Sequence, residues 1–134
     1  MKKFVNRIDQ FLDQSLTGFA AAHADLVVLN REPLFVRRNA AKPGKVALIS
    51  GGGSGHEPLH SGFVGYGMLD AACPGQVFTS PTPDQMMAAA QAVDTGAGVL
   101  FIVKNYSGDL MNFEMAAEMC AMPNATVLVN DDVA

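Results

Sequence analysis

The sequence predicts an α/β fold in which helices flank a largely parallel or mixed sheet. Two apolar runs, Val46–Ile49 and Gly98–Val103, each lead into a polar or glycine-rich loop, as strands covered on both faces do. A segment of helical character, Asp84–Val93, lies between them. Strands that alternate with helices favour a parallel sheet with right-handed crossovers. A length of 134 residues suits one domain.

The N-terminal region predicts a helix followed by two short strands. Apolar residues recur there at helical spacing, with polar residues between them, at Phe4, Ile8, Phe11, Leu12, Leu16 and Phe19. Two β-prone runs follow, Leu26–Leu29 and Leu34–Val36, and the turn-forming residues Asn30–Pro33 separate them. Either run could form an edge strand of the sheet.

A strand, a loop and a helix are expected in the middle of the chain. Gln76–Phe78 has the character of a strand, and the helix Asp84–Val93 follows after a short loop. Thr82 is expected to cap that helix, with Pro83 at its first helical position. The preceding stretch, Leu59–Leu69, contains three glycines that disfavour a helix.

The C-terminal third predicts another strand, loop, helix and strand. Gly98–Val103 has the strongest strand character in the chain, and the polar loop Lys104–Gly108 follows it. Asp109–Met122 then carries apolar residues at spacings of three and four, which predicts a helix. Thr126–Val129 is expected to form a further buried strand.

The composition favours a cytoplasmic protein without a nucleic-acid or membrane partner. The net charge is -4, whereas nucleic-acid binding needs clustered Lys and Arg. No apolar run approaches the ~18 residues of a membrane span. Polar residues interrupt the segment after Lys2-Lys3, so no secretory signal is expected. Cys73 and Cys120 have no CxxC spacing, which favours free thiols in a reducing compartment.

The most informative motif is the glycine-rich stretch that follows Ile49. Four of the five residues Gly51–Gly55 are glycine, and His56 and Glu57 come next. Glycine lacks a Cβ and allows a ligand to approach the backbone closely, so we expect a ligand-binding loop. Phosphate-binding and nucleophile motifs do not fit, because a Walker loop ends in Gly-Lys-Ser/Thr and neither GxGxxG nor GxSxG matches.

His56, Glu57 and His60 match the letters of the zinc-protease motif HExxH. A zinc hydrolase is therefore an alternative function. That motif places both imidazoles on one face of a helix, with a third ligand from elsewhere in the chain. No third ligand is evident, and a zinc site leaves the preceding glycines unexplained, so we expect no bound metal.

Two loops are expected to meet at the carboxyl edge of the sheet, where open α/β sheets bind ligands. One is the glycine-rich loop with His56, and the other contains Lys104 and Asp109. An imidazole, an ammonium and a carboxylate suit a small polyol or keto-alcohol whose hydroxyl is to be deprotonated. Each residue also has a structural interpretation: a loop histidine, a solvated lysine and a helix cap.

Five ordered motifs together resemble the N-terminal part of the dihydroxyacetone kinase family. They are Ser50–Pro58, Gly67–Leu69, Phe78–Asp84, Val103–Asp109 with Asn112–Glu114, and Asp131–Val133. The similarity covers nearly the whole chain and is greatest to the substrate-binding K subunits of the phosphotransferase-system-linked enzymes. It implies an α/β K-domain fold, a homodimer and dihydroxyacetone as the ligand.

The resemblance also implies roles for individual residues. The positions that match the family's substrate contacts are Gly53, Ser54, Gly55, His56, Lys104 and Asp109. His56 and Asp109 match its acid/base residues. ATP or ADP with Mg is bound by a separate L subunit or domain in the family, so no cofactor is expected in this chain.

The family's covalent substrate anchor has no match in this chain. It is a second histidine, which forms a hemiaminal with the substrate carbonyl and lies well downstream; neither His23 nor His60 matches it. We therefore expect residues 1–134 to be an incomplete dihydroxyacetone-binding domain that is inactive as a kinase by itself. A non-catalytic dihydroxyacetone-binding regulatory module is the alternative, and the phosphoryl donor is left open between phosphoenolpyruvate and ATP.

Overall fold

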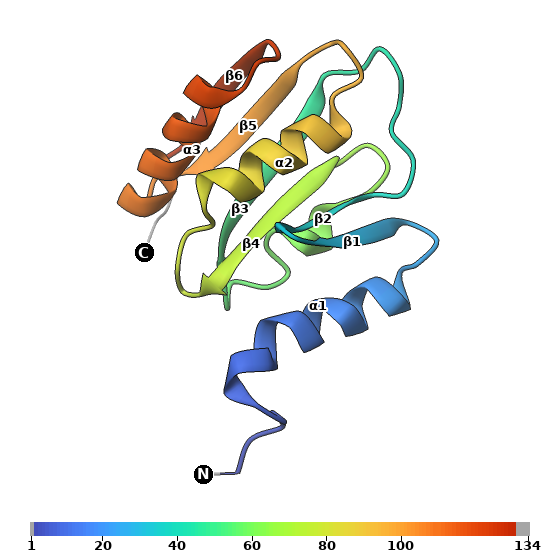
Figure 1. Ribbon diagram of the computed structural model, residues 1–134, viewed down its shortest axis with the longest axis vertical. Helices are drawn as coiled ribbons and strands as arrows, with labels where there is room; N and C mark the ends of the chain where they lie inside the picture. The colour runs from blue at the N-terminus through green and yellow to red at the C-terminus, as the bar shows by residue number, and fades with distance from the viewer. Residues whose placement is uncertain (1, 131–134) are drawn as a thin grey trace.

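The computed structural model describes residues 2–130 and contains a six-stranded sheet with helices on both faces (Figure 1). The helices are α1 (Phe11–Ala22), α2 (Pro83–Val93) and α3 (Ser107–Met119). The strands are β1 (Val27–Arg31), β2 (Leu34–Arg38), β3 (Ala47–Ser54), β4 (Ala71–Val77), β5 (Val99–Lys104) and β6 (Asn124–Val129). Short 3-10 turns occupy Ile8–Gln10 and Ser61–Phe63.

The sheet is mixed, with strand order β1-β2-β4-β3-β5-β6. Strands β4, β3, β5 and β6 are parallel to their neighbours. Strands β1 and β2 form an antiparallel hairpin that joins the sheet through β4. The α2 and α3 connections lead from β4 to β5 and from β5 to β6. The predicted α/β class, with its largely parallel or mixed sheet, is therefore confirmed.

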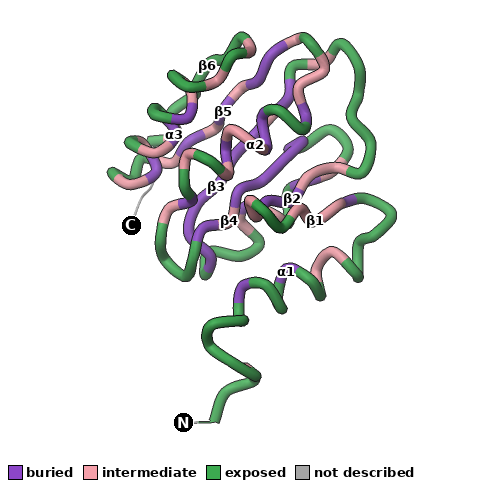
Figure 2. The backbone as a smooth tube through the Cα atoms, viewed as in Figure 1, coloured by how far each residue is buried: buried purple, intermediate pink, exposed green. Residues whose placement is uncertain are grey.

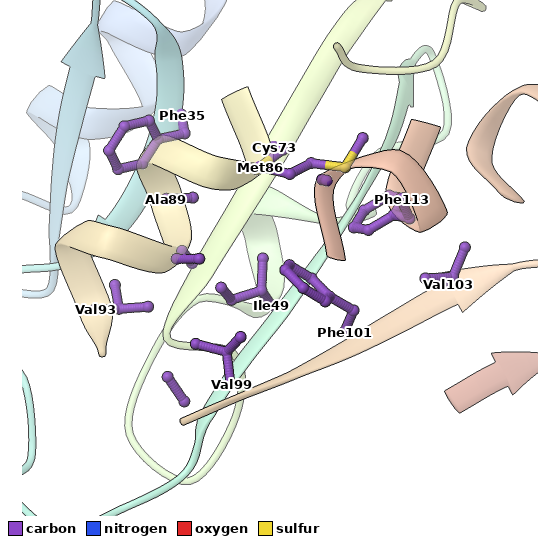
Figure 3. Close-up of a cluster of buried hydrophobic side chains, with 14 residues drawn as sticks. Phe35, Ile49, Cys73, Met86, Ala89, Val93, Val99, Phe101, Val103 and Phe113 are labelled. Atoms are coloured by element: carbon purple, nitrogen blue, oxygen red, sulfur yellow. The ribbon is translucent and has the colours of Figure 1, made fainter. Parts of the chain in front are cut away.

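The larger core lies between the sheet and helices α2 and α3, which share one face (Figure 1). Ile49 and Phe101 point from β3 and β5 toward Met86 and Phe113 of the two helices (Figure 3). The Phe101 and Phe113 rings meet edge to face with centroids 5.7 Å apart. Since side chains alternate along a strand, the intervening residues of β3 and β5 face the opposite side of the sheet.

Helix α1 covers only part of that opposite side. Leu12 and Leu16 pack against Val27, Val36 and Ala72 of strands β1, β2 and β4. Beyond them, the segment between β3 and β4 crosses this face as turns rather than as a helix. Burial is accordingly concentrated in the middle of the sheet, while β6 and the N-terminal segment are exposed (Figure 2).

The N-terminal predictions are partly wrong. Helix α1 begins at Phe11 rather than at Phe4, and Phe4 and Ile8 are exposed. A helix in water is stabilised mainly by packing of its apolar face, and only the part of this segment from Leu12 onward reaches the sheet. Strand β2 lies between β1 and β4, so β1 is the edge strand of this pair.

Several other boundaries differ from the predictions. Strand β4 begins at Ala71, before the predicted Gln76, because it pairs with β3 along that length and with β2 at Ala71 and Ala72. Helix α3 begins at Ser107 and ends at Met119. Strand β6 starts at Asn124 and is mostly exposed rather than buried as predicted, because among the described residues it is an edge strand with a neighbour on one side only. In contrast, Thr82 is the N-cap of α2 and Pro83 its first helical residue, as predicted.

The two cysteines are free thiols, as predicted, and burial raises the pKa of Cys73 and of Cys120. No helix within residues 2–130 is both long and apolar enough to cross a membrane. The motif Asp131–Val133 lies outside the described residues.

Candidate functional site

The carboxyl ends of β3 and β5 lie side by side, as predicted. The strands are parallel neighbours, and Ser50 pairs with Ile102. The Ser50 hydroxyl also donates a 2.6 Å hydrogen bond to the Ile102 carbonyl. Gly52 and Lys104, each two residues further along, are therefore level at the same edge of the sheet. Ligands of open α/β sheets bind at this edge.

The glycine-rich stretch is mostly strand, which corrects the prediction that a loop begins after Ile49. Gly51–Gly53 lie within β3 and are buried. A Cβ on Gly53 would lie 2.7 Å from the Thr79 amide nitrogen and 2.9 Å from the Phe78 carbonyl carbon. Glycine at this position therefore allows the backbone of the loop after β4 to pack closely against β3.

Gly52 lies against two side chains instead of backbone. A Cβ there would be 2.8 Å from Nζ of Lys104 and 2.9 Å from Cε1 of His60. Because both distances are measured from the same point, Nζ of Lys104 and Cε1 of His60 lie near each other. The space that a larger residue would fill is thus shared by an ammonium and an imidazole.

A cavity of about 650 Å³ opens on the face of the sheet opposite helices α2 and α3. Its apolar wall consists of Leu48, Leu59, Phe63, Met68, Leu69, Ile102 and Val129. Its polar lining is formed by Ser50, His56, His60, Lys104, Asn105 and Tyr106. A mostly apolar pocket with a few convergent polar groups is the usual form of a small-molecule site.

Lys104 supplies the positive charge of the cavity. It is the last residue of β5 and is half-buried. Its ammonium lies 5.2 Å from the centre of the Tyr106 ring, and no carboxylate in residues 2–130 forms an ion pair with it. The charge is therefore available to the oxygen atoms of a ligand.

His60 is a neutral group beside that charge. Its side chain is buried, and burial, together with the charges of Lys104 and His56, lowers its pKa to about 4. At neutral pH the ring therefore has one donor nitrogen and one acceptor nitrogen.

His56 lies at the exposed rim of the cavity, just past the end of β3. Its ring meets Phe78 edge to face, with centroids 5.2 Å apart and planes at 83°. Phe78 itself has a positive φ of 51°, and it comes from the loop after β4. Two loops of the sheet edge thus hold this imidazole where solvent and a ligand can reach it.

The zinc-hydrolase alternative is not supported by this arrangement. His56 and His60 line the same cavity, but the residues that join them form turns and not the helix of that motif. Within the part of the chain that the structure describes, no three His, Cys, Asp or Glu side chains are grouped as metal ligands.

Asp109 is in the first turn of α3 and is only 2% exposed. Its Oδ1 atom has no hydrogen-bond partner among the described residues. The adjacent Gly108 packs against Ser80, because a Cβ on Gly108 would lie 2.7 Å from the Ser80 hydroxyl oxygen. A carboxylate at this point also interacts favourably with the helix dipole, so the structural interpretation of Asp109 applies alongside the functional one.

The structure brings only some of the predicted site residues together. His56 and Lys104 line the cavity, whereas Gly53, Ser54, Gly55 and Asp109 lie outside its lining. Gly53 and Gly55 have no side chain to contribute to the lining.

Two of these residues make contacts within the chain. The Ser54 hydroxyl donates a 2.7 Å hydrogen bond to the Gly75 carbonyl. The Gly55 N–H donates a 2.9 Å hydrogen bond to the Glu57 carboxylate. Sequence reasoning did not single out Gly52, and it considered His60 only as a zinc ligand and as a position that does not match the covalent histidine.

Comparisons with known proteins identify the family of this chain. The Dak1 domain model matches residues 17–134. The chain is 52% identical to the dihydroxyacetone-binding subunit DhaK of the PEP-dependent dihydroxyacetone kinase of Escherichia coli K12, over 100% of this chain and 38% of that protein. It therefore spans less than half the length of this relative.

Solved structures are also similar to this chain. The dihydroxyacetone kinase from C. freundii, in complex with AMP-PNP and Mg²⁺, superposes with a TM-score of 0.92 at 40% identity, over 98% of this chain and 26% of that one. A dihydroxyacetone kinase operon co-activator superposes with a TM-score of 0.83 at 34% identity, over 90% of this chain and 38% of that one. By fold, by sequence and by domain model, the chain belongs to the Dak1 domain family.

Proposed function

We propose that this chain forms the N-terminal part of the dihydroxyacetone-binding domain of a dihydroxyacetone kinase. The relatives with this function align along its whole length. The observation that carries the proposal is the placement of Lys104 and His56 on one cavity at the carboxyl edge of the sheet. In the complete protein, this cavity holds dihydroxyacetone for phosphorylation to dihydroxyacetone phosphate.

Lys104 and Asp109 suit a small neutral keto-alcohol. The unpaired ammonium donates hydrogen bonds to carbonyl or hydroxyl oxygens. The buried Oδ1 of Asp109 lacks a partner among the described residues, and a buried acceptor without a partner is destabilising. A ligand hydroxyl that donates to Asp109 removes that penalty. Backbone groups at Gly53, Ser54 and Gly55 complete the contacts on the side of β3.

His56 and Asp109 serve as the acid/base residues of the reaction. Transfer of a phosphoryl group to a hydroxyl requires that the hydroxyl lose its proton, and imidazole and carboxylate groups are the usual acceptors. His56 is exposed at the rim of the cavity, so its proton can exchange with solvent after each turnover. His60 is too weak a base for this step, since its pKa is lowered to about 4.

The nucleotide and a second subunit complete the enzyme. The sequence has no Gly-Lys-Ser/Thr phosphate loop, and ATP or ADP with Mg is bound by a separate L subunit or domain. That subunit approaches the open cavity, and the dihydroxyacetone-binding subunit forms a homodimer in the cytoplasm, where glycerol-derived trioses are metabolised.

A regulatory role is the second candidate function. The co-activator with a TM-score of 0.83 has this fold and is named as an operon co-activator. A sensor needs the same ligand cavity, so the site residues do not separate the two functions. Phosphate transfer separates them, because a sensor that binds dihydroxyacetone forms no dihydroxyacetone phosphate with the nucleotide-bearing subunit.

Steady-state kinetics of the complete enzyme with its nucleotide-bearing subunit test the proposal. We expect Lys104→Met to raise KM for dihydroxyacetone by about tenfold or more, the usual effect of losing a hydrogen bond from a charged group. We expect His56→Ala to lower kcat by about 100-fold, as for loss of an acid/base residue. Lys42→Met is the matched control, because Lys42 is exposed and outside the cavity. Unchanged kinetics in both site variants would contradict the proposal.

A further inference from the structure

Two residues without an assigned role surround the ammonium of Lys104. A Cβ on Gly52 would lie 2.8 Å from Nζ and 3.0 Å from Cε of Lys104. It would also lie 2.9 Å from Cε1 of His60. Nearly all real Cβ atoms keep a greater distance from their neighbours, so any side chain at Gly52 must displace Lys104, His60 or both.

The chemistry of His60 suits a neighbour of a cation. Cε1 is bonded to both ring nitrogens, so the unprotonated nitrogen lies next to Cε1 in either tautomer. Among residues 2–130, the structure has no hydrogen bond to this ring, so its acceptor nitrogen is available to the nearby ammonium. The ring is also buried, and a cation beside it disfavours its protonation. His60 therefore remains an acceptor while Lys104 is charged.

We propose that Gly52 and His60 are positioning residues that hold the Lys104 ammonium toward the ligand. Gly52 leaves the space for the ammonium beside β3, and the neutral imidazole of His60 offers an acceptor to one of its three N–H groups. The two remaining N–H groups are then directed into the cavity. The inference rests on the proposed function only in identifying the ligand as dihydroxyacetone.

The geometry distinguishes Gly52 from its two glycine neighbours in β3. At Gly51 and Gly53 an added Cβ would approach backbone atoms of other segments, which cannot move without disturbing the sheet. At Gly52 the obstructing atoms belong to the ends of two side chains. Gly52→Ala is therefore expected to fold and to move Lys104, rather than to unfold the protein.

The test combines an NMR measurement on Lys104 with dihydroxyacetone binding by calorimetry. The side-chain resonance of Lys104 is assigned by its loss in Lys104→Arg. We expect Gly52→Ala and His60→Leu to shift this resonance and to weaken dihydroxyacetone binding by about tenfold. We expect His60→Asn or His60→Gln, which retain an acceptor, to restore both.

Gly18→Ala is the matched control, since a Cβ at Gly18 meets nothing within 4 Å. If Gly52→Ala does not fold, the comparison of His60→Leu with His60→Gln tests the inference. An unchanged Lys104 resonance in the folded variants overturns the inference. Because that resonance is measured without ligand, absence of dihydroxyacetone binding in the wild-type protein would contradict the proposed function alone.

Discussion

The Ser50 hydroxyl donates a 2.6 Å hydrogen bond to the carbonyl of Ile102, the residue that lies opposite it in the parallel β3–β5 pair. This contact reinforces the register that places Gly52 level with Lys104. Both Ser50 and Ile102 also line the cavity. One hydrogen bond therefore links the pairing of two strands to the placement of the ammonium.

We expect Ser50→Ala to lower the free energy of unfolding by about 1 kcal/mol, the usual contribution of one internal hydrogen bond. The side chain is buried, so loss of the hydroxyl also leaves a small gap. Urea denaturation measures the change, and Ser61→Ala, outside the sheet, serves as the control. Equal stabilities of wild type and Ser50→Ala would show that the backbone ladder alone sets the register.

Glycine at position 75 is required by backbone packing. A Cβ there would overlap the carbonyl oxygen of Thr79, which belongs to the loop that covers Gly53. We expect Gly75→Ala to lower the free energy of unfolding by about 2–3 kcal/mol, as overpacking does. Thermal denaturation measures it, and a melting temperature equal to that of Gly18→Ala would contradict the prediction.

Lowering the pH is expected to decrease the stability of the folded protein, because the buried His60 resists protonation. Its pKa is lowered from 6.5 to about 4 in the folded state. The unfolded chain therefore binds more protons between these two values, and stability falls as the pH decreases from about 6.5 to about 4. The contribution is up to about 3 kcal/mol.

His60→Asn removes this titration without removing a polar side chain. Urea unfolding at several pH values in this window should give a smaller loss of stability for the variant than for the wild type. Carboxylates that titrate in the same range affect both proteins equally. Parallel pH profiles for the two proteins would contradict the assignment to His60.

The Asp109 carboxylate is expected to lower the stability of the folded protein and to strengthen ligand binding. Its Oδ1 is buried without a partner among the described residues, so Asp109→Asn, which removes the charge, should raise the free energy of unfolding by about 1 kcal/mol. The same change should weaken dihydroxyacetone binding by about tenfold, because the ligand hydroxyl loses a charged acceptor. Denaturation and calorimetry measure the two effects; a variant that binds normally would favour the purely structural interpretation of Asp109.

Much of the fold could be predicted because local signals agree with the tertiary structure. The apolar runs at Val46–Ile49 and Gly98–Val103 lie in strands from Ala47 and from Val99 onward, and Thr82 caps α2 as expected. The errors arise where tertiary contacts override local sequence. Phe4 has helical spacing but no sheet to pack against, and the glycines after Ile49 are extended because β4 pairs with them.

The candidate site was predictable only in part for a similar reason. His56 and Lys104 could be placed at one sheet edge from strand order alone, and the structure places both on one cavity. Gly52 and His60 could not, because their proximity depends on the β3–β5 register and on the path of the turns after β3. Neither feature has a signal in a single sequence.

Titration of the isotope-labelled protein with dihydroxyacetone, followed by NMR, tests the central claim most directly. We predict saturable shifts of backbone and side-chain resonances at His56, Lys104 and the glycines of β3, and their loss in Lys104→Met. Resonances of α1, which lies outside the cavity lining, should not change. Absence of shifts at millimolar ligand, or shifts confined to residues away from the cavity, would contradict the claim that this site binds dihydroxyacetone.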